Sequence, residues 1–331
     1  LEAAGHKVGL IGTIEQFDGN TSIPAAMTTP GPDVLAELMR RMVDAGCSHA
    51  VMEVSSHALD QRRVAGVAFD AAVFTNLTQD HLDYHSDLTA YREAKWRLFR
   101  ELAPTACAVL NADDPTSEIY AKDCPGRIVR YGIRNKAEFV AHAVHRSLDG
   151  NRFEVEGDRN RVVMTSRLVG NHNVYNCLAA ATVGRRLGLD WTTIQAGIVR
   201  VQGVPGRLEA VHAGQPFHVF VDYAHTPDAV ESVLKSLRAI TPGRILCLMG
   251  AGGDRDRTKR PLMARAAESV ADMIVVTSDN PRTEDPHQII SEIVAGFRRV
   301  RALAIEPDRR AAIELVMAVA QPGDCVLLAG K

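Results

Sequence analysis

The chain has 331 residues, of which 46% are hydrophobic and 24% are charged, and its formal net charge is -2. This composition is typical of a globular protein long enough for two domains, and the near-neutral charge gives no reason to expect a nucleic acid or a membrane as partner. The longest apolar runs have the length of a strand, so we expect no transmembrane helix or secretory signal. Six scattered cysteines without CxxC pairing indicate reduced thiols in a cytoplasmic protein.

Alternating strands and helices in the first part of the chain predict a mainly parallel sheet. We expect strands at residues 8–13, 49–54, 71–74 and 107–111, with helices at about 33–45 and after Ser86 or Asp87. Between residues 138 and 168 the apolar residues recur with period two, and a turn is expected at 149–151. This change predicts an antiparallel hairpin layer.

A polar run holding Asp80, His81, Asp83 and His85 follows the strand at 71–74. The carboxyl end of a strand is where open α/β sheets bind their ligands. The next helix carries an apolar stripe formed by Leu88, Tyr91, Leu98, Phe99 and Leu102, and Lys95 falls on the same stripe. An inward-facing ammonium group is costly unless it is paired or chemically modified. A lysine that snorkels past the stripe to solvent explains the spacing equally well.

Other polar residues stand at strand ends or helix entrances. Glu53 is the only charge in its apolar strand. Burying an unpaired carboxylate there is unfavourable, so we expect a metal or a cation as its partner. The loop residues Thr28 and Thr29 suit phosphate or sugar hydroxyls, but they also fit an ordinary turn. Gln61 and Arg63 could bind an anionic substrate or form a solvated helix end. Residues 171–176 hold three asparagines and a histidine at a helix entrance, more than capping requires.

Residues 202–207, QGVPGR, have the composition of a linker and divide the chain into predicted domains at 1–203 and 204–331. Strands at 217–221, 245–249, 273–277, 302–305 and 325–329 alternate with helices and predict a second doubly wound sheet. Polar clusters follow three of these strands, at 222–227, 250–261 and 278–282. Three such clusters at one sheet edge predict a ligand site there, although the GAGG segment alone is a weak phosphate signal.

Nine motifs occur in order along the chain: MEVSSHAL, FTNLTQDHLDYH, EAKW, NADD, GNHNVYN, PGRLE, VDYAHTPDA, GGDRDRTKRPLM and DNPRTEDP. Together they resemble the Mur ligase family, and within it the ligases that add diaminopimelate. The resemblance covers nearly the entire chain. It implies an α/β protein with a central P-loop-type, mainly parallel sheet domain that carries an antiparallel layer, followed by a Rossmann-like doubly wound domain.

The resemblance also implies an activity. Such enzymes are cytoplasmic ATP-dependent amide ligases of peptidoglycan synthesis, which join meso-diaminopimelate to UDP-MurNAc-L-Ala-D-Glu through an acyl phosphate. They use ATP and Mg²⁺, and we expect a monomer with no nucleic acid or membrane partner. Magnesium and cationic side chains would offset the repulsion among the negative oxygens that meet in the reaction.

The roles of individual residues follow from the same resemblance. Glu53 and His81 would hold magnesium, Lys95 would carry a carboxyl group as N6-carboxylysine, and Lys95 and His225 would be catalytic. Thr28, Thr29, Ser55, Gln61 and Arg63 would bind the UDP-muramoyl dipeptide. Asn76, Asn173, Arg207 and Asp222 would bind ATP together with His225. Arg255, Asp279, Asn280, Arg282 and Gly330 would select the amino acid, because an arginine fork suits the distal carboxylate that lysine lacks.

Two departures and several alternatives remain. The family's GTxGKT-type phosphate loop would precede Leu1 and an acidic residue would follow Lys331, so we expect the 331-residue chain alone to make no product. A metal-dependent hydrolase could use Glu53, His81, Asp83 and His85. A non-catalytic binding protein is a further alternative, which Lys95, Glu53 and His81 disfavour. An L-lysine-adding ligase and a folate or cyanophycin ligase are also alternatives, which the DNPR motif disfavours.

Overall fold

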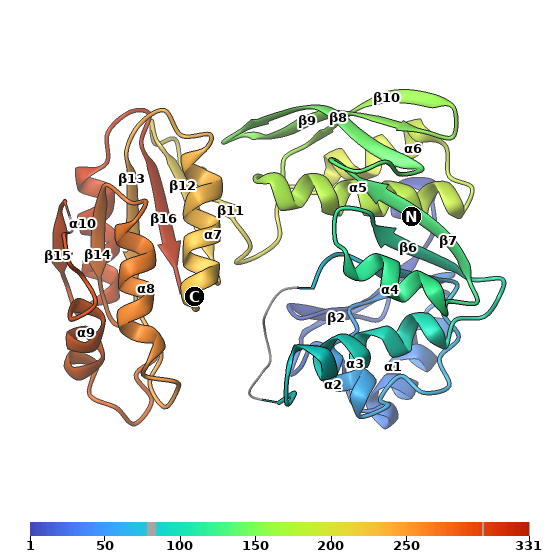
Figure 1. Cartoon of the computed structure of the whole chain (residues 1–331). Coiled ribbons are helices and arrows are strands. Elements are labelled where there is room, and N and C mark those ends of the chain that lie inside the picture. Colours follow the sequence, from blue (N-terminus) through green and yellow to red (C-terminus); the bar gives the residue numbers. More distant parts are fainter. Residues whose placement is uncertain (78–83, 300, 331) are drawn as a thin grey trace. The chain divides into compact units, whose positions relative to one another are not determined.

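The computed structural model describes residues 1–77, 84–299 and 301–330. The chain divides into two compact units, shown with their elements labelled in Figure 1. The first unit comprises residues 1–144, 152–166 and 172–200, and the second comprises 145–151, 167–171 and the chain from Val201 onwards. Asp80, His81 and Asp83 lie outside the described residues.

The first sheet of the first unit has the order β3-β2-β1-β4. Its strands are β1 (Val8–Ile11), β2 (Glu15–Phe17), β3 (Ser22–Pro24) and β4 (His49–Met52), and its helices are η1 (Glu2–Ala4), α1 (Pro32–Asp44) and α2 (Ser56–Asp60). Strands β1 and β4 are parallel, whereas β2 is antiparallel to its neighbours. Helix α1 buries Leu35, Leu38 and Met42, one face at helical spacing, in a core that also contains Ile11 and Leu59.

A second sheet, most of which belongs to the first unit, has the order β10-β9-β8-β7-β6-β5. Its strands are β5 (Ala71–Phe74), β6 (Cys107–Asn111), β7 (Arg127–Gly132), β8 (Phe139–Ser147), β9 (Gly150–Gly157) and β10 (Asn160–Ser166). Its helices are α3 (Leu88–Arg100), α4 (Thr116–Lys122), α5 (Asn171–Arg186) and α6 (Trp191–Arg200). Strands β5 to β8 are parallel, and the tight connections between β8, β9 and β10 make consecutive hairpins, which confirms the predicted antiparallel layer.

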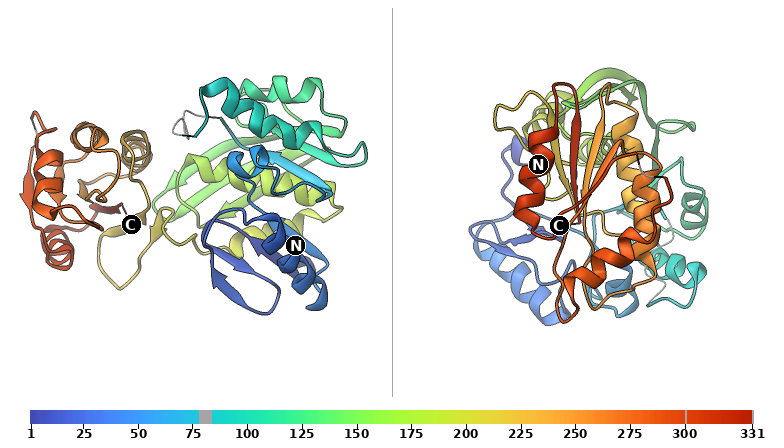
Figure 2. Two further views of the ribbon diagram at one scale, coloured as in Figure 1. Left: turned by 90° about the horizontal axis from the view of Figure 1, so that it is seen from below. Right: turned by 90° about the vertical axis from the view of Figure 1, so that its left-hand side faces the viewer.

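The second unit contains one sheet with the order β11-β12-β16-β13-β14-β15. Its strands are β11 (Glu209–Ala210), β12 (His218–Asp222), β13 (Ile245–Met249), β14 (Met273–Val276), β15 (Leu303–Ile305) and β16 (Cys325–Ala329). Its helices are α7 (Pro227–Arg238), α8 (Lys259–Glu268), α9 (Pro286–Val294) and α10 (Arg309–Val319). Helices α7, α8 and α9 pack on one face of the sheet and α10 packs on the other, as the right view of Figure 2 shows. The predicted doubly wound architecture is confirmed.

All strands in the sheet of the second unit except β11 are parallel, so their carboxyl ends lie at one edge. The three polar clusters predicted from the sequence follow β12, β13 and β14 and therefore share that edge. All six cysteines are free. Within the described part of the chain, no helix has the length and apolar character needed to cross a bilayer.

Candidate active site

In the first unit, Glu53 and Thr13 follow the adjacent parallel strands β4 and β1, whose register pairs Met52 with Ile11. The Thr13 hydroxyl donates a hydrogen bond to Glu53 Oε2 and lies 3.1 Å from the hydroxyl of Thr28. Glu53 is exposed, so its carboxylate is not the buried charge that the apolar strand led us to expect. Its role as a metal ligand stays a prediction. Sequence reasoning missed Thr13, although its place at the end of a strand beside the Glu53 strand was a usable signal.

Thr29 is buried and connects the loop after β4 to the rest of the first unit. Its hydroxyl donates to the backbone oxygen of Glu53 at 2.9 Å and accepts from the backbone N–H of Ser55 at 3.0 Å. The Ser55 hydroxyl accepts from the N–H of Ala58 at 3.2 Å and so caps α2. Both hydrogen-bonding roles of the Thr29 hydroxyl are therefore used within the protein, whereas Thr28 is more exposed.

Gln61 orients the guanidinium group of Arg63. Gln61 Oε1 accepts from Arg63 Nε at 2.9 Å and Nη2 at 2.6 Å, and Arg63 Nη1 donates to the backbone oxygen of Thr29 at 2.8 Å. Gln61 Nε2 in turn donates to the hydroxyl of Tyr84 at 3.2 Å, which donates to Asp60 Oδ2 at 2.8 Å. The structure thus joins Gln61 to Arg63 and adds Tyr84 as a support, neither of which the sequence indicated; the predicted substrate-binding role of the two residues stays a prediction.

His85 is buried, and its Nε2 lies 3.0 Å from the hydroxyl of buried Ser56. Among the described residues, no group of three His, Cys, Asp or Glu side chains is arranged to hold a metal ion. The proposed hydrolase site depends on His81 and Asp83 as well, which lie outside those residues. The structure therefore gives His85 a hydrogen-bond partner in Ser56, and the described residues do not place it in a metal-binding group.

Lys95 lies on α3 between Tyr91 and Phe99, both of which are buried. The side chain of Asp87 caps this helix by accepting from the N–H of Ala90 at 2.8 Å, which decides between the two predicted caps. Lys95 is partly buried, and its ammonium nitrogen lies 5.2 Å from the centre of the Tyr91 ring. The predicted stripe is wrong at its first position, because Leu88 is exposed.

The NADD turn after β6 hydrogen-bonds to residues close in sequence to Asn76 and Asn173. Asn111 Nδ2 donates to the backbone oxygen of Thr75 at 2.6 Å, next to exposed Asn76. Asp113 accepts from the hydroxyl of Tyr175 at 2.8 Å and thereby fixes the first turns of α5, where Asn173 is buried. Asp113 also accepts backbone hydrogen bonds from residues 133–135. Burial raises the pKa of Asp113, but these bonds outweigh it and hold that pKa below its ordinary value.

In the second unit, Arg207 lies over the Tyr223 ring, and Tyr223 meets His225 edge to face; both rings are close in sequence to Asp222. The Arg207 guanidinium lies 5.5 Å from the centre of the Tyr223 ring, and the ring centres of Tyr223 and His225 are 4.8 Å apart. His225 Nδ1 lies 2.9 Å from the backbone oxygen of Tyr223, and because a carbonyl only accepts, Nδ1 carries the proton. The other ring nitrogen of the neutral histidine is then an acceptor. Asp222 accepts from the N–H groups of Leu208 and Ala224 at 2.8 and 2.9 Å.

Gly330 marks the point where the strand ends converge. It has φ 81°, and a Cβ there would lie 3.3 Å from the backbone oxygen of Gly250 and 3.9 Å from both Ala224 O and Asp279 Oδ2. Residues following β12, β13, β14 and β16 therefore meet around one glycine. Arg309, at the start of α10, reaches the same edge: its guanidinium lies 3.3 Å from Ala329 O. Burial lowers the pKa of Arg309, and Asp279 opposes this effect.

The predicted amino-acid-binding arginines lie on two loops at this edge. Arg255 and Arg282 are exposed, and Arg282 Nη1 donates to the backbone oxygen of Gly253. Burial lowers the pKa of Lys259, and the positive charges of Arg255, Arg260 and Arg282 lower it further against the effect of Asp256. The two predicted arginines therefore act electrostatically on Lys259, a residue to which sequence reasoning assigned no role.

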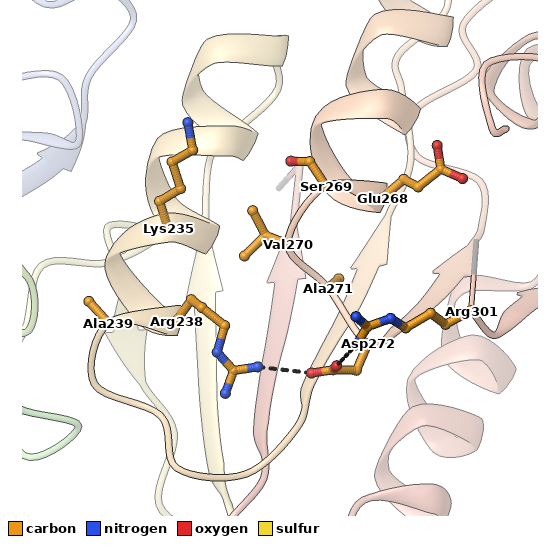
Figure 3. Close-up of a pocket in the computed structure, with 9 residues that line it drawn as sticks. All are labelled: Lys235, Arg238, Ala239, Glu268, Ser269, Val270, Ala271, Asp272 and Arg301. Atoms are coloured by element: carbon orange, nitrogen blue, oxygen red, sulfur yellow. Dashed lines mark hydrogen bonds and ion pairs between the residues drawn. The ribbon is translucent and has the colours of Figure 1, made fainter. Parts of the chain in front are cut away.

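A pocket of about 510 Å³ lies at the opposite, amino-terminal edge of the same sheet (Figure 3). Asp272, which precedes β14, accepts from Arg238 and Arg301 at 2.9 Å each. Figure 3 shows these three side chains pointing toward one another. No predicted site residue lines this pocket, and its central charges are paired.

Comparison with known proteins gives the family. A model described as the Mur ligase middle domain matches residues 1–184, and a model described as the Mur ligase, glutamate ligase domain matches residues 206–331. The UDP-N-acetylmuramoyl-L-alanyl-D-glutamate–2,6-diaminopimelate ligase of Geobacillus thermodenitrificans is 46% identical over 335 residues, which cover 99% of this chain and 68% of that protein. The chain belongs to the Mur ligase family.

Two solved structures agree with the fold. A structure of a UDP-N-acetylmuramoyl-L-alanyl-D-glutamate–2,6-diaminopimelate ligase matches with a TM-score of 0.75 and 35% identity, covering 100% of this chain and 68% of that one. The folylpolyglutamate synthase of Mycobacterium tuberculosis, solved with ADP and AMPPCP, also gives a TM-score of 0.75, at 20% identity and with 100% and 83% of the two chains covered. The latter similarity shows the fold alone.

Proposed function

We propose that this Mur ligase adds meso-diaminopimelate to UDP-MurNAc-L-Ala-D-Glu in an ATP-dependent reaction of peptidoglycan synthesis. The observation that carries the proposal is that Arg255 and Arg282 are exposed on two loops that hydrogen-bond to each other where β13 and β14 end. Diaminopimelate differs from lysine by a carboxylate at its distal end, and guanidinium groups pair with a carboxylate through two parallel hydrogen bonds. The diaminopimelate ligases with which the chain shares 46% identity support the same substrate.

In this proposal the first unit binds the anionic dipeptide precursor. Arg63, which Gln61 holds in one orientation, supplies a positive charge, and Ser55 and Thr28 supply polar contacts. Thr29 acts through its backbone bonds, because its hydroxyl already donates to Glu53 O and accepts from Ser55 N. We therefore expect Thr28 rather than Thr29 to contact the substrate directly.

Glu53 fits a magnesium ion. It is an exposed carboxylate whose Oε2 is fixed by Thr13, and Mg²⁺ commonly takes only one or two protein carboxylates while keeping several waters. His81 would be a second ligand. Bound there, magnesium would neutralise the phosphate oxygens of ATP and so assist attack by the substrate carboxylate on the γ-phosphate.

Lys95 would carry a carboxyl group on its side-chain nitrogen. The resulting negative charge would replace an ammonium group that is partly buried above the Tyr91 ring. Asn76, Asn173, Arg207, Asp222 and His225 would contact ATP. The free acceptor nitrogen of His225 and the exposed guanidinium of Arg207 suit hydrogen bonds to a nucleotide.

The reaction class can be tested by isotope transfer. The γ-carboxylate of the D-glutamate residue is labelled with ¹⁸O, and the intact gene product is supplied with ATP, Mg²⁺ and meso-diaminopimelate. The labelled carboxylate attacks the γ-phosphate of ATP and ADP leaves. When the amine then displaces phosphate from the acyl carbon, one labelled oxygen leaves with the inorganic phosphate. Labelled phosphate supports the proposal, whereas tripeptide formed with unlabelled phosphate, or no ATP-dependent tripeptide, overturns it.

A further inference from the structure

Two loops of the second unit, residues 250–258 after β13 and 278–285 after β14, are joined along their length. The N–H of Gly253 donates to the backbone oxygen of Asn280 at 2.9 Å. A Cβ at Gly253 would overlap the backbone oxygen of Pro281, so only glycine permits this approach. The carboxylate of Asp254 accepts from the hydroxyl of Thr283 at 2.7 Å, and the N–H of Asp254 donates to Glu284 Oε1 at 2.6 Å.

Arg260, on α8, joins the two loops from behind. Its side chain is 0% exposed. Nη1 and Nη2 donate to the two oxygens of Glu284 at 2.8 Å each, Nη1 also donates to Glu292 Oε2 at 2.6 Å, and Nη2 lies 3.3 Å from the backbone oxygen of Gly252. Arg257 pairs with Glu292 as well. Two guanidinium groups and two carboxylates thus balance in charge.

The buried contacts of Arg260 support the two loops that carry the exposed arginines. Arg260 contacts Gly252 in the first loop and Glu284 in the second, and the predicted substrate-binding Arg255 and Arg282 stand on those same loops. Arg282 has a left-handed backbone with φ 50° and Asp254 has φ 51°, conformations that non-glycine residues adopt only when their surroundings hold them. The exposed arginines can keep a fixed separation only if the loops beneath them keep theirs.

We infer that Arg260, together with Glu284, is a positioning residue that sets the spacing of Arg255 and Arg282 and thereby the preference for an amino acid with a distal carboxylate. This inference rests on the proposed function. Arg260 does not touch the substrate; it fixes the two loops as one rigid support. Bidentate recognition of a carboxylate tolerates little displacement, so a looser support costs affinity for diaminopimelate but not for the amine and carboxylate that lysine shares with it.

The test compares ligation of meso-diaminopimelate and of L-lysine by the intact gene product. Arg260→Lys keeps the charge but cannot bond two carboxylates and a carbonyl at once. Thr283→Val, at an exposed position, removes one bond between the loops without burying a charge. We expect Arg260→Lys to lower the ratio of kcat/KM for the two amino acids by about tenfold or more, mainly through KM for diaminopimelate. Thr283→Val should lower it less.

Arg310→Lys is the matched control, because Arg310 pairs with Glu314 on the surface with both side chains largely exposed, and the ratio should not change. If the wild-type enzyme shows no preference for diaminopimelate, the proposed function fails. If the wild type shows the preference and Arg260→Lys and Thr283→Val both keep it, the positioning role fails even when Arg260→Lys is less stable. Should Arg260→Lys not fold, the ratio for Thr283→Val decides alone.

Discussion

The Thr13 hydroxyl donates a hydrogen bond to the carboxylate of Glu53 across the ends of two neighbouring parallel strands. The same hydroxyl group lies 3.1 Å from that of Thr28. This relationship fixes one carboxylate oxygen and restricts the rotamer of an exposed glutamate. It also joins the predicted metal ligand to the predicted dipeptide-binding loop, so a change at Thr13 should affect both functions.

Thr13→Val should therefore weaken the use of magnesium. A hydrogen bond to a charged group contributes about 1.5 kcal/mol at an exposed site, so we expect the magnesium concentration for half-maximal ligation to rise about tenfold. Ligation rates across a magnesium titration measure the effect. Thr21→Val, another exposed threonine of the first unit, is the control and should leave the titration unchanged. Equal titrations for wild type and Thr13→Val would show that this hydroxyl does not organise the metal site.

Lys95 should be modified by carbon dioxide. We expect the intact gene product, equilibrated with ¹³C-labelled bicarbonate, to show a carbamate carbonyl signal in ¹³C NMR that disappears in Lys95→Arg. Activity of the wild type should fall after carbon dioxide is removed and return when bicarbonate is added. A spectrum without such a signal, in enzyme that is fully active, would contradict the modification.

The architecture of both units could be predicted from the sequence, because apolar periodicity and the residues that begin and end helices and strands are local features of the chain. Asp87 was one of two predicted caps, and Pro227 and Pro286 each stand at the first position of a helix, a place that proline favours. The predicted convergence of three polar clusters was also correct, since parallel strands necessarily end at one edge. The Gly330 conformation shows how closely the ends approach, which no pattern in the sequence indicates.

The supports of the site were harder to predict because they join residues that are distant in sequence. Tyr84 braces Gln61, and Arg309 reaches Ala329, through contacts that depend on the packing of whole elements. The burial of Glu53 was predicted from an apolar neighbourhood, but the residue follows the last paired position of its strand and points away from the core. The roles assigned to individual site residues stay predictions.

Asp113 should be a major source of stability in the first unit, because its carboxylate accepts three backbone N–H bonds and one from Tyr175. Asp113→Asn replaces one accepting oxygen by a donor, and we expect a loss of about 2 kcal/mol in the free energy of unfolding. Tyr175→Phe removes one bond only and should cost about 1 kcal/mol. Both tryptophans, Trp96 and Trp191, lie in the first unit, so their fluorescence during urea denaturation reports this change. Equal stability of Asp113→Asn and wild type would contradict the assignment.

The second unit should lose stability in acid partly through Glu284. Its hydrogen bonds from Arg260 and from the N–H of Asp254 lower its pKa from 4.5 to about 2. The unfolded chain therefore binds more protons between these values, and the stability that Glu284 supplies above pH 4.5 is lost as the pH falls toward 2. Calorimetry from pH 5 to 2.5 should show a smaller decrease in melting temperature for Glu284→Gln than for wild type. Parallel curves for the two proteins would refute this contribution.

The central claim is that positive charges at the carboxyl ends of the strands of the second unit select the distal carboxylate of the added amino acid. The most direct measurement is a competition in which meso-diaminopimelate and L-lysine are offered together to the intact gene product with UDP-MurNAc-L-Ala-D-Glu and ATP, for wild type and for Arg282→Met. The account predicts that wild type forms the diaminopimelate product almost alone, with one ADP per product, and that Arg282→Met loses most of this preference. Equal incorporation of lysine by the wild type, or an unchanged preference in Arg282→Met, would contradict it.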